Sequence, residues 1–358
     1  MRLSGLLLLV IGTLTASIVA PRPAEACAVC IEMPETSLAD HLLSADAIVL
    51  AGPGPDNPFM FVPKEILKGT AQDIARLPEI PFLIDSTTRA AFRADPQKAV
   101  LLTYGATDKD AAGRSVSRKW RRIFMLTPER TRFLQVLNSA EETWQLGDIR
   151  SADRIAFFAA YISHQDRVLR DTALIEIDRA PYDLVRSLRI KVPTEQMLQE
   201  FRDINRIGFV PVSIRLLGLQ TDDTEAVSIV RSRYRHALST GSSYLYEWAL
   251  AGIEVDGSNA VAAIDGVLGT GNRKMEDRRA LVRALAEGGS VSPKLRGQII
   301  QIFSRILNHD SALALDIAIA SRDWGETLLD DQFKALLELE DTDPATRFVI
   351  ETWLAPQE

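Results

Sequence analysis

The sequence predicts a multidomain protein of mixed α and β structure, in which a small β-barrel is followed by an all-α array of helical repeats. Three patterns lead to this expectation. Short apolar segments separated by turn residues fill much of the first 139 residues, apolar residues recur at helical spacing from about Glu141, and similar helical segments return every 32 to 42 residues. We place a signal peptide at residues 1–26, the barrel domain at 27–139 and the helical-repeat domain at 140–358.

The N-terminus has the pattern of an export signal. Arg2 is the only charged residue before an uncharged run that ends at Pro21. Ala24 and Ala26 then supply the small residues that signal peptidase accepts, which predicts cleavage after Ala26. A spanning helix needs about 20 apolar residues, and polar residues interrupt this run, so a retained anchor and acylation of Cys27 remain the alternatives. We therefore expect an exported protein, periplasmic or extracellular, with no membrane span after cleavage.

Composition is that of a soluble globular chain, with 46% hydrophobic and 25% charged residues. Cleavage would remove two of the 41 basic residues and one of the 48 acidic residues, leaving 39 and 47 and a net charge of −8. This acidic balance argues against nucleic acid or anionic lipid as a general partner. We expect the partner to be another exported protein.

The chain has two cysteines, Cys27 and Cys30, and cleavage would place Cys27 first in the mature protein. Two cysteines in an oxidising compartment form at most one disulfide. A bridge between these two would close a very short loop and so add little stability. A reactive or metal-bound pair and pairing with another molecule are the alternatives, although a zinc site would need two further ligands and the four histidines are scattered.

Short apolar segments between turn residues predict the barrel. A short helix at 37–44 comes first, with Ser37 as its expected N-cap. Five strands follow, at residues 47–52, 59–67, 80–84, 99–104 and 121–126. The fourth segment is continuous in apolar residues, which predicts a central strand. We expect the core at Ile48, Val49, Leu101 and Leu102.

Cysteines directly after the signal peptide, the segment Ala45-Asp-Ala-Ile-Val-Leu-Ala-Gly52, and Phe61-Val62 through Glu65-Ile-Leu-Lys-Gly69 together resemble the netrin-like fold. That fold is the OB-type barrel of tissue inhibitors of metalloproteinases and of many exported bacterial proteins. In the inhibitors, the first mature residue is a cysteine whose amine and carbonyl chelate the zinc of the target protease; the matching residue is Cys27. The inhibitors also tie this segment to the barrel by disulfides to distant cysteines, which this sequence lacks.

From residue 151 onward the apolar spacing predicts one helix after another, at 151–163, 166–179, 182–191, 194–204, 209–219, 223–238, 243–253, 258–268, 273–287, 293–308, 311–321, 328–338 and 344–354. Six segments with small residues on an apolar helix are similar, and they begin at Arg170, Val212, Tyr246, Arg278, Ser311 and Ala345. A repeat of this length is typical of helical solenoids, in which each helix pair stacks on its neighbours. The unit resembles a degenerate HEAT repeat; an irregular helical bundle is the alternative.

One basic segment with an aromatic residue, Arg118-Lys-Trp-Arg-Arg122, is a candidate site. Its residues Arg118, Trp120, Arg121 and Arg122 could contact a partner or an anion. The alternative is a strand edge on which alternating charges discourage pairing with another chain. Trp248 and Trp324 lie within helical runs, where packing is the expected role.

No catalytic motif is present: the sequence has no Gly-x-Ser-x-Gly, P-loop, His-Glu-x-x-His or Gly-x-Gly-x-x-Gly after a strand. We therefore expect no cofactor and a non-catalytic binding or scaffold protein, which engages a protein partner through the barrel and the helical array. The alternative is a role centred on Cys27 and Cys30, whether thiol redox chemistry, metal binding or, as the resemblance implies, inhibition of a metalloprotease.

Overall fold

The computed structural model describes residues 37–81, 84–109, 115–140, 143–144, 148–270, 273–340 and 342–355. The predicted signal peptide and both cysteines lie outside these residues. The described part begins with α1 (Leu38–Leu43), where the Ser37 hydroxyl accepts a hydrogen bond from the Asp40 backbone N–H at 3.1 Å. The predicted N-cap is therefore confirmed.

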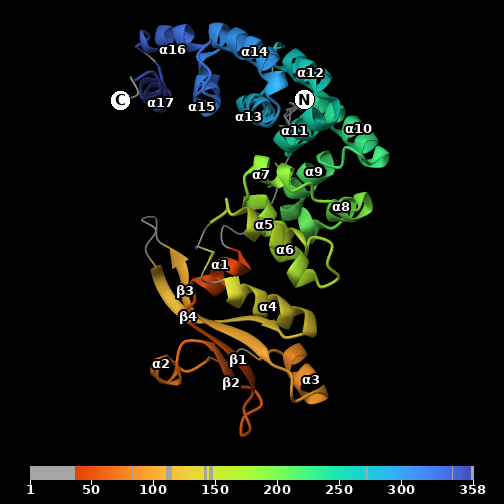
Figure 1. Cartoon of the computed structure of the whole chain (residues 1–358), viewed down its shortest axis with the longest axis vertical. Helices are drawn as coiled ribbons and strands as arrows, with labels where there is room; N and C mark the ends of the chain where they lie inside the picture. The colour runs from red at the N-terminus through yellow and green to blue at the C-terminus, as the bar shows by residue number, and fades with distance from the viewer. Residues whose placement is uncertain are drawn as a thin grey trace, which may run out of the picture. The chain divides into compact units, whose positions relative to one another are not determined.

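Four antiparallel strands form one sheet in the order β2-β1-β3-β4 (Figure 1). They are β1 (Ala47–Pro53), β2 (Phe61–Lys68), β3 (Val100–Lys109) and β4 (Ser115–Met125). Val49 of β1 lies opposite Ile66 of β2 and Leu102 of β3. β3 is a central strand, as its continuous apolar run predicted. Since β2 and β4 do not pair with each other, the described strands form an open sheet, and the predicted closed barrel is not confirmed.

The prediction of a strand at residues 80–84 is wrong for the residues described there, Ile80, Pro81 and Ile84. Proline has no N–H to donate to a strand ladder; Pro81 lies within this stretch and Pro78 lies two residues before it. Ile84 instead packs into the core, and the chain then enters α3 (Ser86–Ala94). Three helices in this region were not predicted: α2 (Ala71–Arg76), α3 and α4 (Pro128–Ala140).

Both faces of the sheet are covered. On one face Ile48, Leu101 and Phe124 belong to a core shared with α1 and α4. On the other, Val49 and Leu102 pack in a second core whose further members are Phe61, Ile84, Phe92, Tyr104 and Trp120. The four core residues that the sequence predicted are each at most 4% exposed. Burial on both faces is the reason why β3 carries apolar residues without alternation.

All-α structure from residue 151 is confirmed, and a helix occupies each predicted segment. The helices are α5 (Ala152–Ala159), α6 (Arg167–Arg179), α7 (Tyr182–Ser187), α8 (Thr194–Glu200), α9 (Val210–Gly218), α10 (Thr224–Thr240), α11 (Leu245–Asp256), α12 (Ser258–Leu268), α13 (Met275–Val291), α14 (Arg296–His309), α15 (Ala314–Trp324), α16 (Asp330–Leu337) and α17 (Pro344–Leu354). Three-residue to six-residue 3₁₀ turns at Ile204–Phe209, Pro293–Leu295 and Ser311–Leu313 precede α9, α14 and α15.

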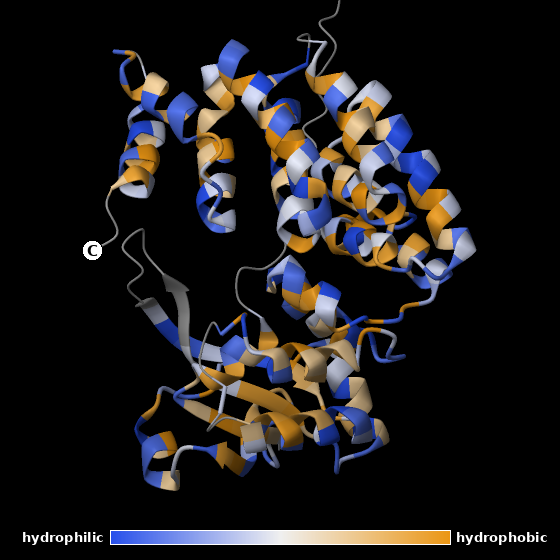
Figure 2. Cartoon of the chain, turned by 45° about the horizontal axis from the view of Figure 1, so that its top comes forward, coloured by the Kyte–Doolittle hydropathy of each residue, from blue (hydrophilic) through white to orange (hydrophobic). Residues whose placement is uncertain are grey.

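Ten of these helices form two rows. The six similar sequence segments lie in or at the start of α6, α9, α11, α13, α15 and α17, and each of these helices contacts the next; we call them the first row. α10, α12, α14 and α16 likewise contact one another in order and form the second row (Figure 1). Each helix mixes apolar and polar residues (Figure 2), as expected for helices that bury one side and expose the other.

Glycines allow close approach between these helices. A Cβ atom on Gly218 of α9 would lie 2.7 Å from the Cα of Ala251 in α11. One on Gly252 would lie 2.7 Å from the ring of Tyr234 in α10. Real Cβ atoms do not approach this closely, so the small residues noted in the repeated segments are a packing requirement.

A buried ion network joins α1 to α5 and α6. Arg154 is fully buried; it donates to both carboxylate oxygens of Glu176, at 3.1 and 2.9 Å, and to Asp40 Oδ1 at 2.8 Å. Arg179 also pairs with Asp40, at 2.5 Å. The apolar core on the α1 side of the sheet also continues from Ala39 through the helices to Ile350. Residues on both sides of the predicted 139/140 boundary therefore share one core.

Candidate functional site

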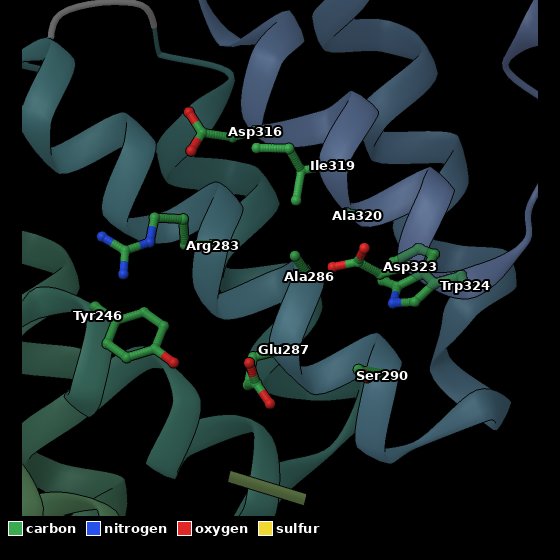
Figure 3. A pocket seen from close by; sticks show the side chains of 10 residues that line it. All are labelled: Tyr246, Arg283, Ala286, Glu287, Ser290, Asp316, Ile319, Ala320, Asp323 and Trp324. Carbon is green, nitrogen blue, oxygen red and sulfur yellow. The ribbon is translucent and has the colours of Figure 1, made fainter. Parts of the chain in front are cut away.

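The first row of helices carries a pocket of about 250 Å³ (Figure 3). Residues of three consecutive first-row helices line it: Tyr246 of α11; Arg283, Ala286, Glu287 and Ser290 of α13; and Asp316, Ile319, Ala320, Asp323 and Trp324 of α15. A second pocket of about 550 Å³ shares Tyr246 and Arg283 with the first and extends to Arg215 of α9 and Asp178 of α6. The two pockets therefore adjoin along the row.

Two aromatic side chains bound the first pocket. The Arg283 guanidinium lies over the Tyr246 ring, 5.2 Å from its centroid, a distance at which a cation is attracted to the ring. Trp324 stacks on Phe303 with ring centroids 5.8 Å apart, and Arg296 lies 5.5 Å from the Trp324 centroid. Gly289 makes room for this indole, because a Cβ there would lie 2.4 Å from it. Trp324 thus packs between helices, as predicted, and also lines the pocket.

Burial raises the pKa of three carboxyl groups on this surface. For Glu287 the negative charges of Asp183 and Asp323 add to the effect, against the opposing charges of Arg215 and Arg283. Burial likewise raises the pKa of Glu247 and of Asp316. Glu247 and Glu287 form no ion pair within the described ranges. Burial is the main cause for all three groups, because it disfavours the ionised form of a carboxyl group.

Tyr246 has the polar group that faces Glu287. Its hydroxyl is directed toward the side of the pocket where Glu287 lies (Figure 3). Burial, with the charge of Glu287, raises the pKa of Tyr246 to about 12. The phenol is thus protonated at neutral pH and can donate or accept a hydrogen bond.

The arrangement suits binding by charge, hydrogen bonds and aromatic contact. Among the residues that the structure describes, no three His, Cys, Asp or Glu side chains are grouped so that they could hold a metal ion. Within the same residues, no helix is long and apolar enough to cross a membrane.

The residues of the predicted basic segment lie on β4, an edge strand, and do not act as one group. Arg118 donates to Asp46 Oδ1 at 2.5 Å, and Arg122 pairs with Asp85 and donates to Thr88 Oγ1 at 2.9 Å. These are contacts within the sheet and its adjoining helices.

Two residues of the same segment have distinct environments. Trp120 is 5% exposed and donates its indole N–H to the Pro78 carbonyl oxygen at 2.8 Å, so it belongs to the core. Arg121 is half-buried, and its charge, together with the larger effect of burial, lowers the pKa of His41 on α1. The structure separates these side chains, and none lies in the pocket on the first row. The other predicted site residues, Cys27 and Cys30, lie outside the described residues.

Sequence reasoning missed the two pockets, although some of their residues stand in the similar segments. Tyr246 and Glu247 begin the third segment, Arg283 lies in the fourth and Asp316 in the fifth. A polar or charged residue within an otherwise apolar repeat was the available signal.

Comparison with known proteins adds no relative: no family model matches the chain, and no curated protein or solved structure matches it significantly.

Proposed function

We propose that the protein is an exported, non-catalytic binding or scaffold protein, which engages another exported protein through its helical array. The observation that carries this proposal is the pair of adjoining pockets on the first row. Glu287 lines one and Glu247 lines the other, and neither carboxyl group forms an ion pair within the described residues. Such groups remain available to a partner. Export itself rests on the sequence of residues 1–26.

The array is proposed to be a degenerate HEAT-like solenoid. Support comes from the similar segments, which fall in consecutive first-row helices that contact one another. In a solenoid each repeat contacts its neighbours and leaves an extended surface for ligands. The relation of residues 27–139 to the netrin-like family is likewise a proposal; it rests on segments that form β1 and β2, and a second contact through this part of the chain would fit it.

Photocrosslinking within the exporting cell tests the proposal. A photoreactive amino acid at Ser290, an exposed residue of the pocket, should crosslink a discrete exported protein. The matched control is Asn259 on α12 of the second row, which is also exposed and should give no such product. A partner that crosslinks equally from both positions, or from Lys119 on β4 alone, would contradict the proposed surface.

A role for Cys27 and Cys30 is the alternative proposal, and it rests on their place at the expected mature N-terminus. Intact mass measurement with and without reductant reports both the N-terminus and the thiol state. We expect a chain that begins at Cys27 and carries a stable disulfide. A bound metal, or a disulfide that glutathione reduces readily, would favour the alternative.

A further inference from the structure

The two adjoining pockets form one acidic face along α6, α9, α11, α13 and α15. Seven carboxylates and two guanidiniums line it, a net charge of −5 when all are ionised. The carboxylates belong to Asp178, Glu247, Glu276, Asp277, Glu287, Asp316 and Asp323, and the guanidiniums to Arg215 and Arg283. We use the term acidic face for these nine residues.

Internal ion pairs leave much of this charge unbalanced. Arg215 pairs with Asp178, and Asp323 pairs with the neighbouring Arg322 at 2.9 Å. Asp316 lies 3.9 Å from Arg279. The remaining four carboxylates, those of Glu247, Glu276, Asp277 and Glu287, form no ion pair within the described residues. The Arg283 guanidinium lies over the Tyr246 ring. Unlike Arg215, it forms no ion pair with a carboxylate within the described residues.

From this charge pattern we infer that the acidic face binds an extended, lysine- or arginine-rich segment of the partner. The inference rests on the proposed function and adds the chemistry of the ligand. Complementary charge selects such a partner over an acidic or neutral one, because like charges brought together cost several kcal/mol while opposite charges steer association. Tyr246 and Trp324 offer apolar surface to the methylene stems of lysine or arginine.

Helix spacing indicates the spacing of the basic residues. Packed helices have axes about 8–10 Å apart. A chain in the extended polyproline II conformation advances about 3.1 Å per residue with three residues per turn, so that every third side chain lies on the same face. A segment that crosses the first row would therefore present one cation to each helix if its basic residues recur about every third position. The segment would place successive cations at Glu247 of α11, Glu287 of α13 and Asp323 of α15.

Binding of synthetic peptides to the full mature protein tests the inference. The probe is a peptide of four Lys-Ser-Gly units, roughly the length that crosses four helices at these spacings, and its control carries Glu in place of Lys. Fluorescence anisotropy at low salt should show binding of the lysine peptide and weak or no binding of the glutamate peptide. Affinity should fall as salt is raised, since the pairs are partly exposed.

Substitutions then locate the site. The double variant Glu247→Gln, Glu287→Gln should weaken lysine-peptide binding about tenfold or more, as expected for loss of charge-assisted hydrogen bonds. The matched control is Glu225→Gln, Glu338→Gln, which removes the same charge outside the face and should leave affinity unchanged. Gln should not impair folding, because burial raises the pKa of both glutamates and so disfavours the ionised form in the folded state; an unchanged or higher melting temperature checks this.

Two results would overturn the inference: equal affinity for the lysine and glutamate peptides, or equal weakening by the two double variants. If the Ser290 crosslink to a natural partner persists while lysine peptides fail to bind, the proposed function stands and only the ligand chemistry is wrong. If the crosslink also fails, the proposed function is lost.

Discussion

A single buried arginine carries much of the contact between α1 and the helices at residues 152–179. Arg154 and Glu176 have fully buried side chains, and that of Asp40 is 3% exposed. Burial opposes ionisation of Asp40, but the hydrogen bonds and charges of Arg154 and Arg179 outweigh it and lower its pKa. Since the folded-state pKa is lowered, the resulting stability is present above the ordinary value of 3.8 and is lost as pH falls below it.

The variant Asp40→Asn should lower the free energy of unfolding by about 3–5 kcal/mol at neutral pH, because it leaves Arg154 and Arg179 without their shared carboxylate. The control Asp46→Asn removes an exposed ion pair with Arg118 and should cost at most about 1 kcal/mol. Denaturant titration followed by circular dichroism measures both. The gap between wild type and Asp40→Asn should narrow as pH falls below 3.8; equal losses in the two variants would refute this account.

At the scale of helices, stacking depends on positions where no side chain fits. Gly218 and Gly252 lie at the contacts of α9 with α11 and of α11 with α10. In both cases the nearest atoms belong to backbone or to a ring whose position the surrounding core holds. Gly266 of α12 is the contrasting case, since a Cβ there would meet nothing within 4 Å.

Alanine at Gly218 or Gly252 should therefore destabilise the protein, by roughly 1–3 kcal/mol for an overpacked contact. Alanine at Gly266 should stabilise it by about 0.5–1 kcal/mol, because alanine is the better helix former and the space is open. Thermal or denaturant unfolding of the three variants measures the difference in sign. If all three alanine variants were more stable than the wild type, the helices at Gly218 and Gly252 could move apart without loss of stability, which would contradict this account.

For the whole molecule, the shared core sets the outcome of cutting the chain near the predicted boundary. A fragment of residues 141–358 keeps Arg154 and Glu176 but loses Asp40, and it also loses the apolar surface of Ala39, Leu42 and Phe124. We expect this fragment to be helical by circular dichroism, because its repeats contact their neighbours in sequence. It should melt at a lower temperature than the whole protein.

Comparison of the fragment with full-length Asp40→Asn separates the loss of the Asp40 carboxylate from the loss of apolar contacts. The fragment should be the less stable of the two, since it lacks apolar contacts as well as the carboxylate. A fragment that melts at the temperature of the whole chain would mean that the shared core contributes little. An unfolded fragment would show that the boundary near residue 140 is wrong.

Local pattern was enough to determine the helices from residue 151, the N-cap at Ser37, the central position of β3 and its buried residues. Each of these follows from neighbours in sequence: apolar spacing, a hydroxyl before a helix, or an unbroken apolar run. The missed helix α4 had the same kind of signal, with Phe133, Leu134 and Leu137 buried on one side. It was not predicted because the residues up to 139 were all assigned to the barrel domain.

Tertiary structure alone decided which segments meet. Whether four strands close or stay open depends on pairing between distant residues, and the sequence pattern is the same in both cases. Trp120 is a core residue because β4 places it against Tyr104 and Pro78. The pocket exists because the third, fourth and fifth similar segments lie on adjoining helices. The raised pKa of Glu287 also depends on tertiary structure, because its causes are burial and the charges of Asp183 and Asp323, which lie on other helices.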